Sequence, residues 1–362
     1  MDNTQPEKDI ANLAALVDAL PALEAARLRA LFHISVSTGV VVPPPEMHDW
    51  IRGFFGSLEA TLQQTIVKVT NLWTLEGALF NGLRAHRPME AKVSGDLEAE
   101  IRAKLKGPFS IPLTGTPADS FGRVRGRRCI TASNIAKYDG YHGVIVYDEP
   151  YPLTFEADDV ADYLDTALEW ARRAHAEDPA ARYFFFMWNC LWKAGASILH
   201  GHAQTTMTRD MHYARVEAWR RAGVNYRMTH GRNYFQDLYD AHRSLGLTLE
   251  WGKTRVVSSL TPIKEKEVLL ISETLDDDLK RGLYRVLRCY IDRLGVRSFN
   301  VALYLPPIAP APEDWSGFPA ILRIVDRGDP LNRTADIGAM ELYAASVIAN
   351  DPFRVVEALA RA

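Results

Sequence analysis

Cysteine is scarce in this chain. Among its 362 residues are three cysteines, Cys129, Cys190 and Cys289, which lie far apart and form no C-x-x-C pair. This pattern argues against a disulfide framework and favours a reducing, cytoplasmic compartment. The sequence also lacks any apolar run close to the length of a membrane span, and its polar start, MDNTQPEKDI, does not resemble a secretory signal. We therefore expect no membrane association.

An excess of charge of one sign is also lacking. The 42 basic residues nearly balance the 45 acidic ones, and the formal net charge is -3. The sequence therefore gives no basis for nucleic-acid binding or for attraction to an anionic membrane. The hydrophobic fraction of 47% is ordinary for a globular protein, and the length allows two or three modules. No short-period repeat is visible.

The most informative stretch is 189–207, NCLWKAGASILHGHAQTTM, which follows a strongly apolar segment. In an extended strand His200, His202 and Gln204 would share one face, because side chains alternate between faces. Two imidazoles and a carboxamide are poor core material, since each needs a hydrogen-bond partner when buried. The small residues at 194–197 predict a turn where backbone can approach a ligand. Together these features indicate a site for an anionic group.

The residues alone leave three interpretations of His-x-His-x-Gln open. Alternate histidines on a strand can share a zinc ion. A neutral imidazole can instead attack phosphorus and carry the transferred group as a covalent intermediate. The third interpretation is a strand edge with two surface histidines.

The same stretch resembles the active-site signature of the galactose-1-phosphate uridylyltransferase branch of the histidine-triad superfamily. That branch includes phosphorylases of dinucleoside polyphosphates and of nucleoside-diphosphate sugars, and its pattern ends in His-Pro-His-x-Gln. The residues that carry the resemblance are Asn189, Gly195, Ser197 and His200-Gly201-His202-Ala203-Gln204, with Gly201 in place of proline. The resemblance implies that His202 is the nucleophile, that Gln204 and Ser197 contact phosphoryl oxygens, and that Asn189 and Gly195 belong to the substrate site.

A second resemblance lies upstream. The string Arg84-Ala85-His86-Arg87-Pro88 is similar to an Arg-Ala-x-Arg-Pro signature of the same family, in which both arginines face substrate phosphate. Guanidinium groups match phosphate oxygens in geometry and charge. The resemblance also implies that Asn134 touches the nucleotide, with Lys137 as a further candidate for phosphate.

Many family members carry a structural metal, and the resemblance predicts that this chain has lost it. Gly107 and Ser110 stand where the family has the two cysteines of Cys-Pro-x-Cys, and a third ligand falls near Tyr151. Only His200 remains of four ligands, and zinc needs about four nitrogen or sulfur donors in a structural site. We expect no cofactor, and a hydrogen-bonding or orienting role for His200.

The expected fold class is α+β, with two tandem histidine-triad-like units of antiparallel sheet and helices at 71–245 and 246–362. An N-terminal helical segment, 1–70, precedes them, because apolar residues recur at helical spacing over 7–33, with a break at Pro21, and over 46–69. The second unit repeats the pattern of the first without its histidines. Arg323 stands where a histidine is expected and is a candidate for substrate binding. Further candidates for an acceptor pocket, for which plain loop polarity is an equal alternative, are Asn300, Asp326, Arg327 and Glu341.

The resemblance implies a nucleotidyltransferase that moves a nucleoside monophosphate from a nucleoside-diphosphate sugar or related donor to a phosphorylated acceptor, through a nucleotidyl-histidine on His202. Two alternatives remain. One is a phosphorylase or hydrolase of a sugar nucleotide or dinucleoside polyphosphate, and the other is a non-catalytic nucleotide-binding protein. The oligomeric state is open, with a homodimer as one option.

Overall fold

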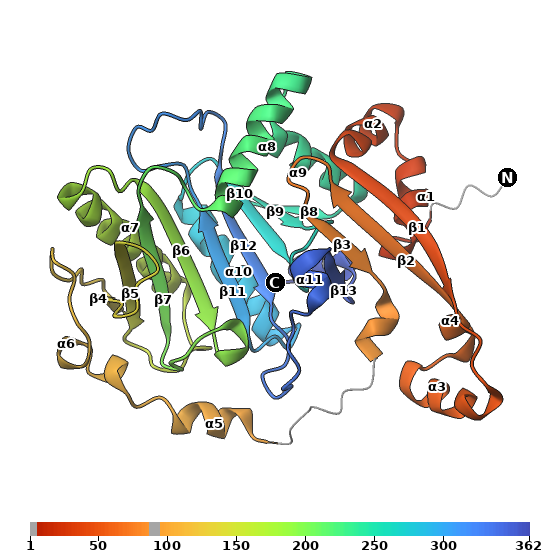
Figure 1. Ribbon diagram of the computed structural model, residues 1–362, viewed down its shortest axis with the longest axis horizontal. Coiled ribbons are helices and arrows are strands. Elements are labelled where there is room, and N and C mark those ends of the chain that lie inside the picture. Colours follow the sequence, from red (N-terminus) through yellow and green to blue (C-terminus); the bar gives the residue numbers. More distant parts are fainter. Residues whose placement is uncertain (1–5, 87–94) are drawn as a thin grey trace.

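The computed structural model describes residues 6–86 and 95–362. Over these residues the strands form two sheets (Figure 1). The smaller sheet has the order β1-β2-β3-β13 and consists of β1 (Phe32–Val40), β2 (Gln63–Asn71), β3 (Gly77–Phe80) and β13 (Ser346–Ile348). The larger sheet has nine strands in the order β4-β5-β7-β6-β11-β12-β10-β9-β8.

The nine-stranded sheet is built from two similar halves. The first half contains β4 (Cys129–Ser133), β5 (Tyr141–Tyr147), β6 (Tyr183–Cys190) and β7 (His202–Thr208). The second half contains β8 (Thr248–Trp251), β9 (Thr254–Ser258), β10 (Val268–Ser272), β11 (Phe299–Tyr304) and β12 (Ala320–Asp326). The halves meet where β6 pairs antiparallel with β11, which sets Asn189 opposite Asn300. The order β4-β5-β7-β6 thus corresponds to β9-β10-β12-β11, and the predicted α+β fold of two tandem units is confirmed.

Helices cover the two faces of this sheet unequally. The long helices α7 (Ala157–Glu177) and α10 (Asp277–Asp292) pack together on one face, where the larger apolar core lies (Figure 1). On the other face, α8 (Ala214–His230) and α9 (Tyr234–Leu245) join the N-terminal segment in a second core over β9, β10 and β12. His202 and Gln204 lie on this second face of the sheet, away from α7 and outside that core.

The N-terminal segment corrects part of the sequence-based prediction. Its helices are α1 (Leu13–Asp18), α2 (Ala22–Leu31), α3 (His48–Phe55) and α4 (Leu58–Leu62), and Pro21 separates the first two as expected. The prediction of helix through residue 69 is wrong, however, because β2 begins at Gln63. β1 was likewise not expected. Both strands are rich in β-branched residues, and such residues favour an extended chain when cross-strand packing is available. The β1–β2 register along nine residue pairs supplies that packing.

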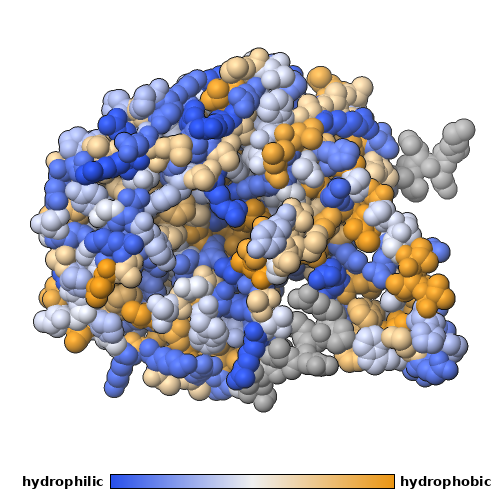
Figure 2. Space-filling view, viewed as in Figure 1, coloured by the Kyte–Doolittle hydropathy of each residue, from blue (hydrophilic) through white to orange (hydrophobic). Residues whose placement is uncertain are grey.

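The far end of this hairpin forms an arm that projects from the body with α3 and α4 (Figure 1). Large apolar side chains are exposed on it, namely Val40, Val42, Met47, Trp50 and Phe54. Figure 2 shows apolar surface at this end of the molecule.

The remaining helices are short. They are α5 (Leu97–Ala103), α6 (Pro112–Gly115), α11 (Ala339–Tyr343) and α12 (Pro352–Leu359), with 3-10 turns η1 (Ile10–Asn12), η2 (Pro45–Met47), η3 (Gly82–His86), η4 (Pro108–Ser110) and η5 (Trp192–Ala194). The short strands β8 and β13 were not expected. Among the helices that the structure describes, none is long and apolar enough to cross a membrane.

Candidate functional site

His202 is the first residue of β7 and is 7% exposed. Its Nδ1 lies 2.8 Å from the carbonyl oxygen of His200. Because a carbonyl only accepts, Nδ1 carries the proton and donates it, which leaves the lone pair on Nε2. Burial lowers the pKa of His202 to about 4, against the hydrogen bond to His200, which raises it. The ring is therefore neutral near pH 7 and presents an unprotonated nitrogen.

The other buried histidines have their ring nitrogens occupied or enclosed. His212 and His242 each use both nitrogens, one toward a carbonyl and one as acceptor of a backbone N–H. His142 also uses both. His200 donates from Nε2 to the Tyr147 carbonyl at 2.8 Å, while its Nδ1 is buried and has no partner in the described part of the chain. Among the described residues, Nε2 of His202 has no hydrogen-bond partner.

Gly201, which stands where the signature that the motif resembles has proline, fits a close approach of backbone segments. A Cβ at this position would lie 2.9 Å from the Glu149 carbonyl oxygen and 2.9 Å from the Tyr147 ring. Its N–H donates to the Pro150 carbonyl at 2.9 Å, which proline could not do. Glycine in place of proline therefore fits this structure, and it allows the backbone segments to pack closely just before His202.

Gln204 shares its face of β7 with His202, as the sequence predicts. Its Oε1 lies 2.8 Å from Nε2 of His142, at the start of β5. Asn134 and Lys137 come from the loop before β5. The Asn134 amide nitrogen is 3.3 Å from the same His142 nitrogen, and the Lys137 ammonium donates to Ser133 Oγ at 2.6 Å. Both candidates therefore lie around His142, which was not among the predicted site residues.

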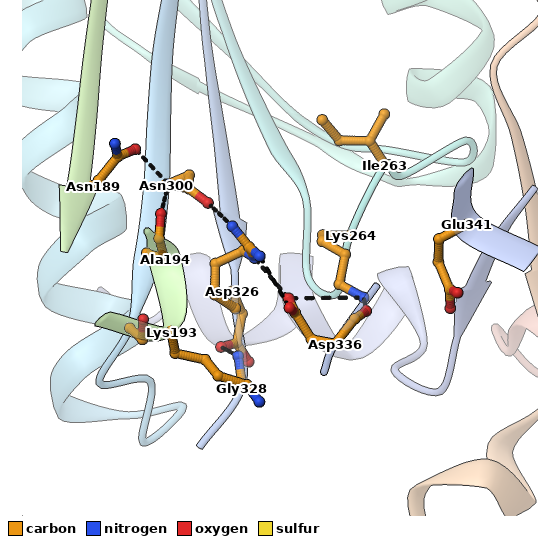
Figure 3. A network of polar contacts seen from close by, with 12 residues as sticks. Asn189, Lys193, Ala194, Ile263, Lys264, Asn300, Asp326, Gly328, Asp336 and Glu341 are labelled. Carbon is orange, nitrogen blue, oxygen red and sulfur yellow. Dashed lines mark hydrogen bonds and ion pairs between the residues drawn. The ribbon is translucent and has the colours of Figure 1, made fainter. Parts of the chain in front are cut away.

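A polar chain links the loop after β6 to the second half of the sheet (Figure 3). Asn300 donates to Asn189 Oδ1 at 2.7 Å and to the Ala194 carbonyl at 2.9 Å, and its own oxygen accepts from Arg327. Arg327 binds the Asp336 carboxylate through two nitrogens, at 2.6 and 3.0 Å. This chain fixes Asn189 and the backbone that leads to Gly195, whose φ of 95° suits glycine.

A cavity of about 340 Å³ lies beside this chain. Acidic and basic residues line it, and several of them pair, such as Lys266 with Asp326 at 2.6 Å. Lys193 instead donates to the carbonyls of Asn332 and Thr334. Arg84 also lines the cavity and forms no ion pair with the described residues. Burial, together with the charges of Arg327 and Lys264, lowers the pKa of Lys193. Lys193 was not among the predicted site residues, although it belongs to the loop of the motif.

A second cavity, of about 350 Å³, opens on the same face of the sheet near Gln204. It is mostly apolar, and its lining includes Tyr138, Phe185, Met187, Tyr213 and Tyr304. Met187 pairs with Gln204 across β6 and β7, so this cavity adjoins the strand that carries His202. Aromatic and thioether side chains of this kind pack favourably against a flat aromatic ring.

Three further predicted site residues have different outcomes. Ser197 is exposed and makes no side-chain hydrogen bond with the described residues. Arg87 lies outside the described residues. Arg323 is buried in the second core, where it donates to Glu267 at 2.8 Å and to Glu76 at 2.7 and 3.1 Å, under the ring of Trp219. The proposal that Arg323 binds substrate is corrected, because two carboxylates already satisfy its guanidinium.

The residues around His200 do not fit a structural zinc ion. Phe109 packs against the rings of His200 and His202, with centroids 6.2 and 5.1 Å away. Gly107 offers no ligand atom, and the Ser110 hydroxyl is used by Leu105 and Gly107. No group of three or more His, Cys, Asp or Glu side chains within the described ranges could hold a metal.

Solved structures provide the comparison with known proteins. No family model matches the sequence, and no curated protein is significantly similar to it. The chain is similar in structure to an ADP-glucose phosphorylase from Arabidopsis thaliana with bound ADP-glucose. The TM-score is 0.61 at 15% identity, covering 81% of this chain and 98% of that one.

Two further solved structures are also similar to this chain. A GalT-like protein from Arabidopsis thaliana matches with a TM-score of 0.55 at 17% identity, covering 70% of this chain and 90% of its own. A uridylyltransferase matches with a TM-score of 0.55 at 17% identity, covering 68% and 89%. The chain therefore has the fold shared by this ADP-glucose phosphorylase and this uridylyltransferase.

Proposed function

We propose that this chain is a nucleotidyltransferase that works by double displacement through His202. One observation carries the proposal: among the buried histidines, His202 is the one whose neutral ring has a proton fixed on Nδ1 and a lone pair on Nε2 that no described residue binds or encloses. A nucleophile needs that combination.

The first half-reaction follows from this geometry. The Nε2 lone pair of His202 attacks the α-phosphorus of a nucleoside-diphosphate sugar or related donor. A P–N bond forms, the bond from phosphorus to the bridging oxygen breaks, and the sugar phosphate leaves with that electron pair. The Nδ1–H bond to the His200 carbonyl stabilises the positive charge that develops on the ring. The amide group of Gln204 is the nearest donor on the same strand face for the phosphoryl oxygens.

The second half-reaction returns His202 to its starting state. An oxygen of a phosphorylated acceptor, or of inorganic phosphate, attacks the phosphorus and displaces the imidazole. The cavity beside Arg327 and Asp336 supports an anionic acceptor, because Lys193 and Arg84 line it and neither forms an ion pair with a carboxylate among the described residues. The apolar cavity near Gln204 suits the nucleobase. Transferase and phosphorylase share the first half-reaction and differ only in the acceptor.

The proposal is tested by intact mass after incubation with ADP-glucose, UDP-glucose or a diadenosine polyphosphate. The wild-type protein should gain one nucleoside monophosphate from the correct donor, and His202→Ala should gain none. His33→Ala, which changes an exposed histidine on β1, is the matched control and should behave as wild type. Adduct formation on His202→Ala would refute the nucleophile. No adduct from any donor on wild type would favour a non-catalytic binding protein.

We also propose that the protein holds no structural zinc, since Phe109 takes the place beside His200. Metal analysis of protein purified without chelator should find much less than one zinc per chain. A stoichiometric zinc content, lost together with stability on chelation, would contradict this.

A further inference from the structure

His142 is completely buried at the start of β5, 62 residues from Gln204 in the chain, yet the two side chains are in hydrogen-bond contact. The backbone N–H of Tyr138 donates to His142 Nδ1 at 3.0 Å, and His142 Nε2 lies 2.8 Å from Gln204 Oε1. Both ring nitrogens are thus committed, one to the preceding loop and one to the strand that bears His202.

The protonation state of this ring follows from its partners. A backbone N–H can only donate, so Nδ1 of His142 must be an acceptor and carries no proton. The single proton of the neutral ring is then on Nε2, which donates it to an acceptor, the carbonyl oxygen of the Gln204 amide. Burial, which lowers the pKa of His142 against the opposing hydrogen bond to Gln204, is consistent with a neutral ring.

This proton decides which way the Gln204 amide faces. The oxygen and nitrogen of a glutamine amide have nearly the same shape, so packing alone does not distinguish the two orientations. With His142 donating, the amide oxygen faces His142 and the NH₂ group is left for another partner. The reversed amide would set two donors against each other.

We propose that His142 is a positioning residue, which holds the Gln204 amide so that its NH₂ group donates to the phosphoryl group under attack by His202. This inference rests on the proposed function. A donor aimed in advance at developing charge needs no reorientation during the reaction. Without His142, the amide would divide its time between a productive orientation and one that presents a carbonyl oxygen to phosphate.

The loop before β5 holds His142 in place. Asn134 N–H donates to the His142 carbonyl at 2.8 Å, and the Tyr138 ring stacks on the imidazole with centroids 4.5 Å apart. The Asn134 amide nitrogen near Nε2 cannot also donate to it, and the Asn134 oxygen already accepts from Ala136 N–H at 3.1 Å. Gln204 is therefore the acceptor for the His142 proton.

A double-mutant cycle on the rate of nucleotidyl-enzyme formation tests this role. Gln204→Ala should slow the step by about 100-fold, the usual effect of removing one aimed donor. His142→Phe keeps a ring of similar size but cannot donate, and should slow the step by roughly tenfold through partial loss of the same donor. Because His142 acts through Gln204, His142→Phe should change the rate little in the Gln204→Ala background. His142→Gln, whose amide can again donate near the Nε2 position, should recover part of the rate.

The outcomes separate this role from a structural one and from failure of the proposed function. If the two losses multiply, or if His142→Gln is as slow as His142→Phe, the positioning role is overturned while the nucleophile stands. If wild type forms no adduct, the proposed function itself fails. Nitrogen-15 NMR of histidine-labelled wild type tests the tautomer without a variant, in case substitution at this buried position prevents folding. A protonated Nε2 and an unprotonated Nδ1 on His142 are expected, and the opposite tautomer would overturn the inference.

Discussion

The two halves of the large sheet have the same strand order, but equivalent strands carry different polar residues. β7 lies between β5 and β6 and carries His202 and Gln204, whereas β12 lies between β10 and β11 and carries Arg323. Both strands direct polar side chains to the same face of the sheet. What differs is the layer above them.

Over β12, the helices α8 and α9 and the N-terminal segment close the face, so Arg323 is buried against Glu76 and Glu267. Over β7 the cover is incomplete, and the apolar cavity opens beside Gln204. A polar residue under a complete cover must be satisfied by the protein itself and therefore contributes to structure. A polar residue under an open cover can be left for a ligand.

The largest expected effect is on chemistry in the first half. His202→Ala should reduce nucleotidyl transfer by about 10⁴-fold or more, as removal of a nucleophile does elsewhere. Thermal unfolding of this variant should shift only modestly, because the ring's one hydrogen bond with the described residues, from Nδ1 to the His200 carbonyl, is lost. Steady-state turnover and a melting curve on one preparation measure both. Comparable losses of activity in Arg323→Met, in protein that is still folded, would break the contrast between the halves.

The reverse effect is expected in the second half. Arg323→Ala should lower the free energy of unfolding by about 3–5 kcal/mol, because it leaves buried carboxylates without their partner. Arg243→Ala is the matched control. Its ion pair with Asp240 is largely exposed on the arginine side and should contribute about 1 kcal/mol or less. Denaturant titrations of the three proteins give the comparison, and equal stability of the two variants would contradict it.

The strand pattern of 200–204 sufficed to predict that His202 and Gln204 share a face, because alternation is a local property. The role of Arg323 could not be predicted this way, since its partner Glu76 lies 247 residues away. The same holds for His142, whose functional meaning depends on contact with Gln204. The strand β2 was missed because apolar residues in 46–69 fit helical spacing, and the pairing with β1 that overrides it is again non-local. Local periodicity predicted many of the elements, while partners distant in the chain decided the strands β1 and β2 and which polar residues are structural.

Acid should lower the free energy of unfolding, because buried histidines in both halves must be protonated as the pH falls. Burial lowers the pKa of His202, His212 and His242 to about 4, below the ordinary value of 6.5. Between these values the unfolded chain binds more protons, so stability is fully present above pH 6.5 and is lost as pH falls toward 4. The slope should reach about 1.4 kcal/mol per pH unit for each histidine. Asp351, whose pKa burial raises to about 6, opposes part of this loss.

Denaturant midpoints at several pH values measure the slope. His242→Gln, on α9 over the second half of the sheet, should reduce this pH slope of the stability. His202→Gln should reduce it as well. The rate of adduct formation should stay flat above about pH 5, because the neutral imidazole then predominates. A rate that rises through pH 6 to 7 would contradict the low pKa of His202.

The smallest expected effect concerns the acceptor side, where the two halves meet. Lys193→Met should raise the KM for inorganic phosphate or a phosphorylated acceptor by about tenfold, the loss of one charge-assisted hydrogen bond of about 1.4 kcal/mol. It should leave adduct formation from the donor nearly unchanged. Lys68→Met, at an exposed position of β2, is the control for general charge effects and should alter neither step. Equal slowing of both half-reactions by Lys193→Met would mean that this lysine serves the donor phosphates instead, and the cavity beside Arg327 would then belong to the first half-reaction alone.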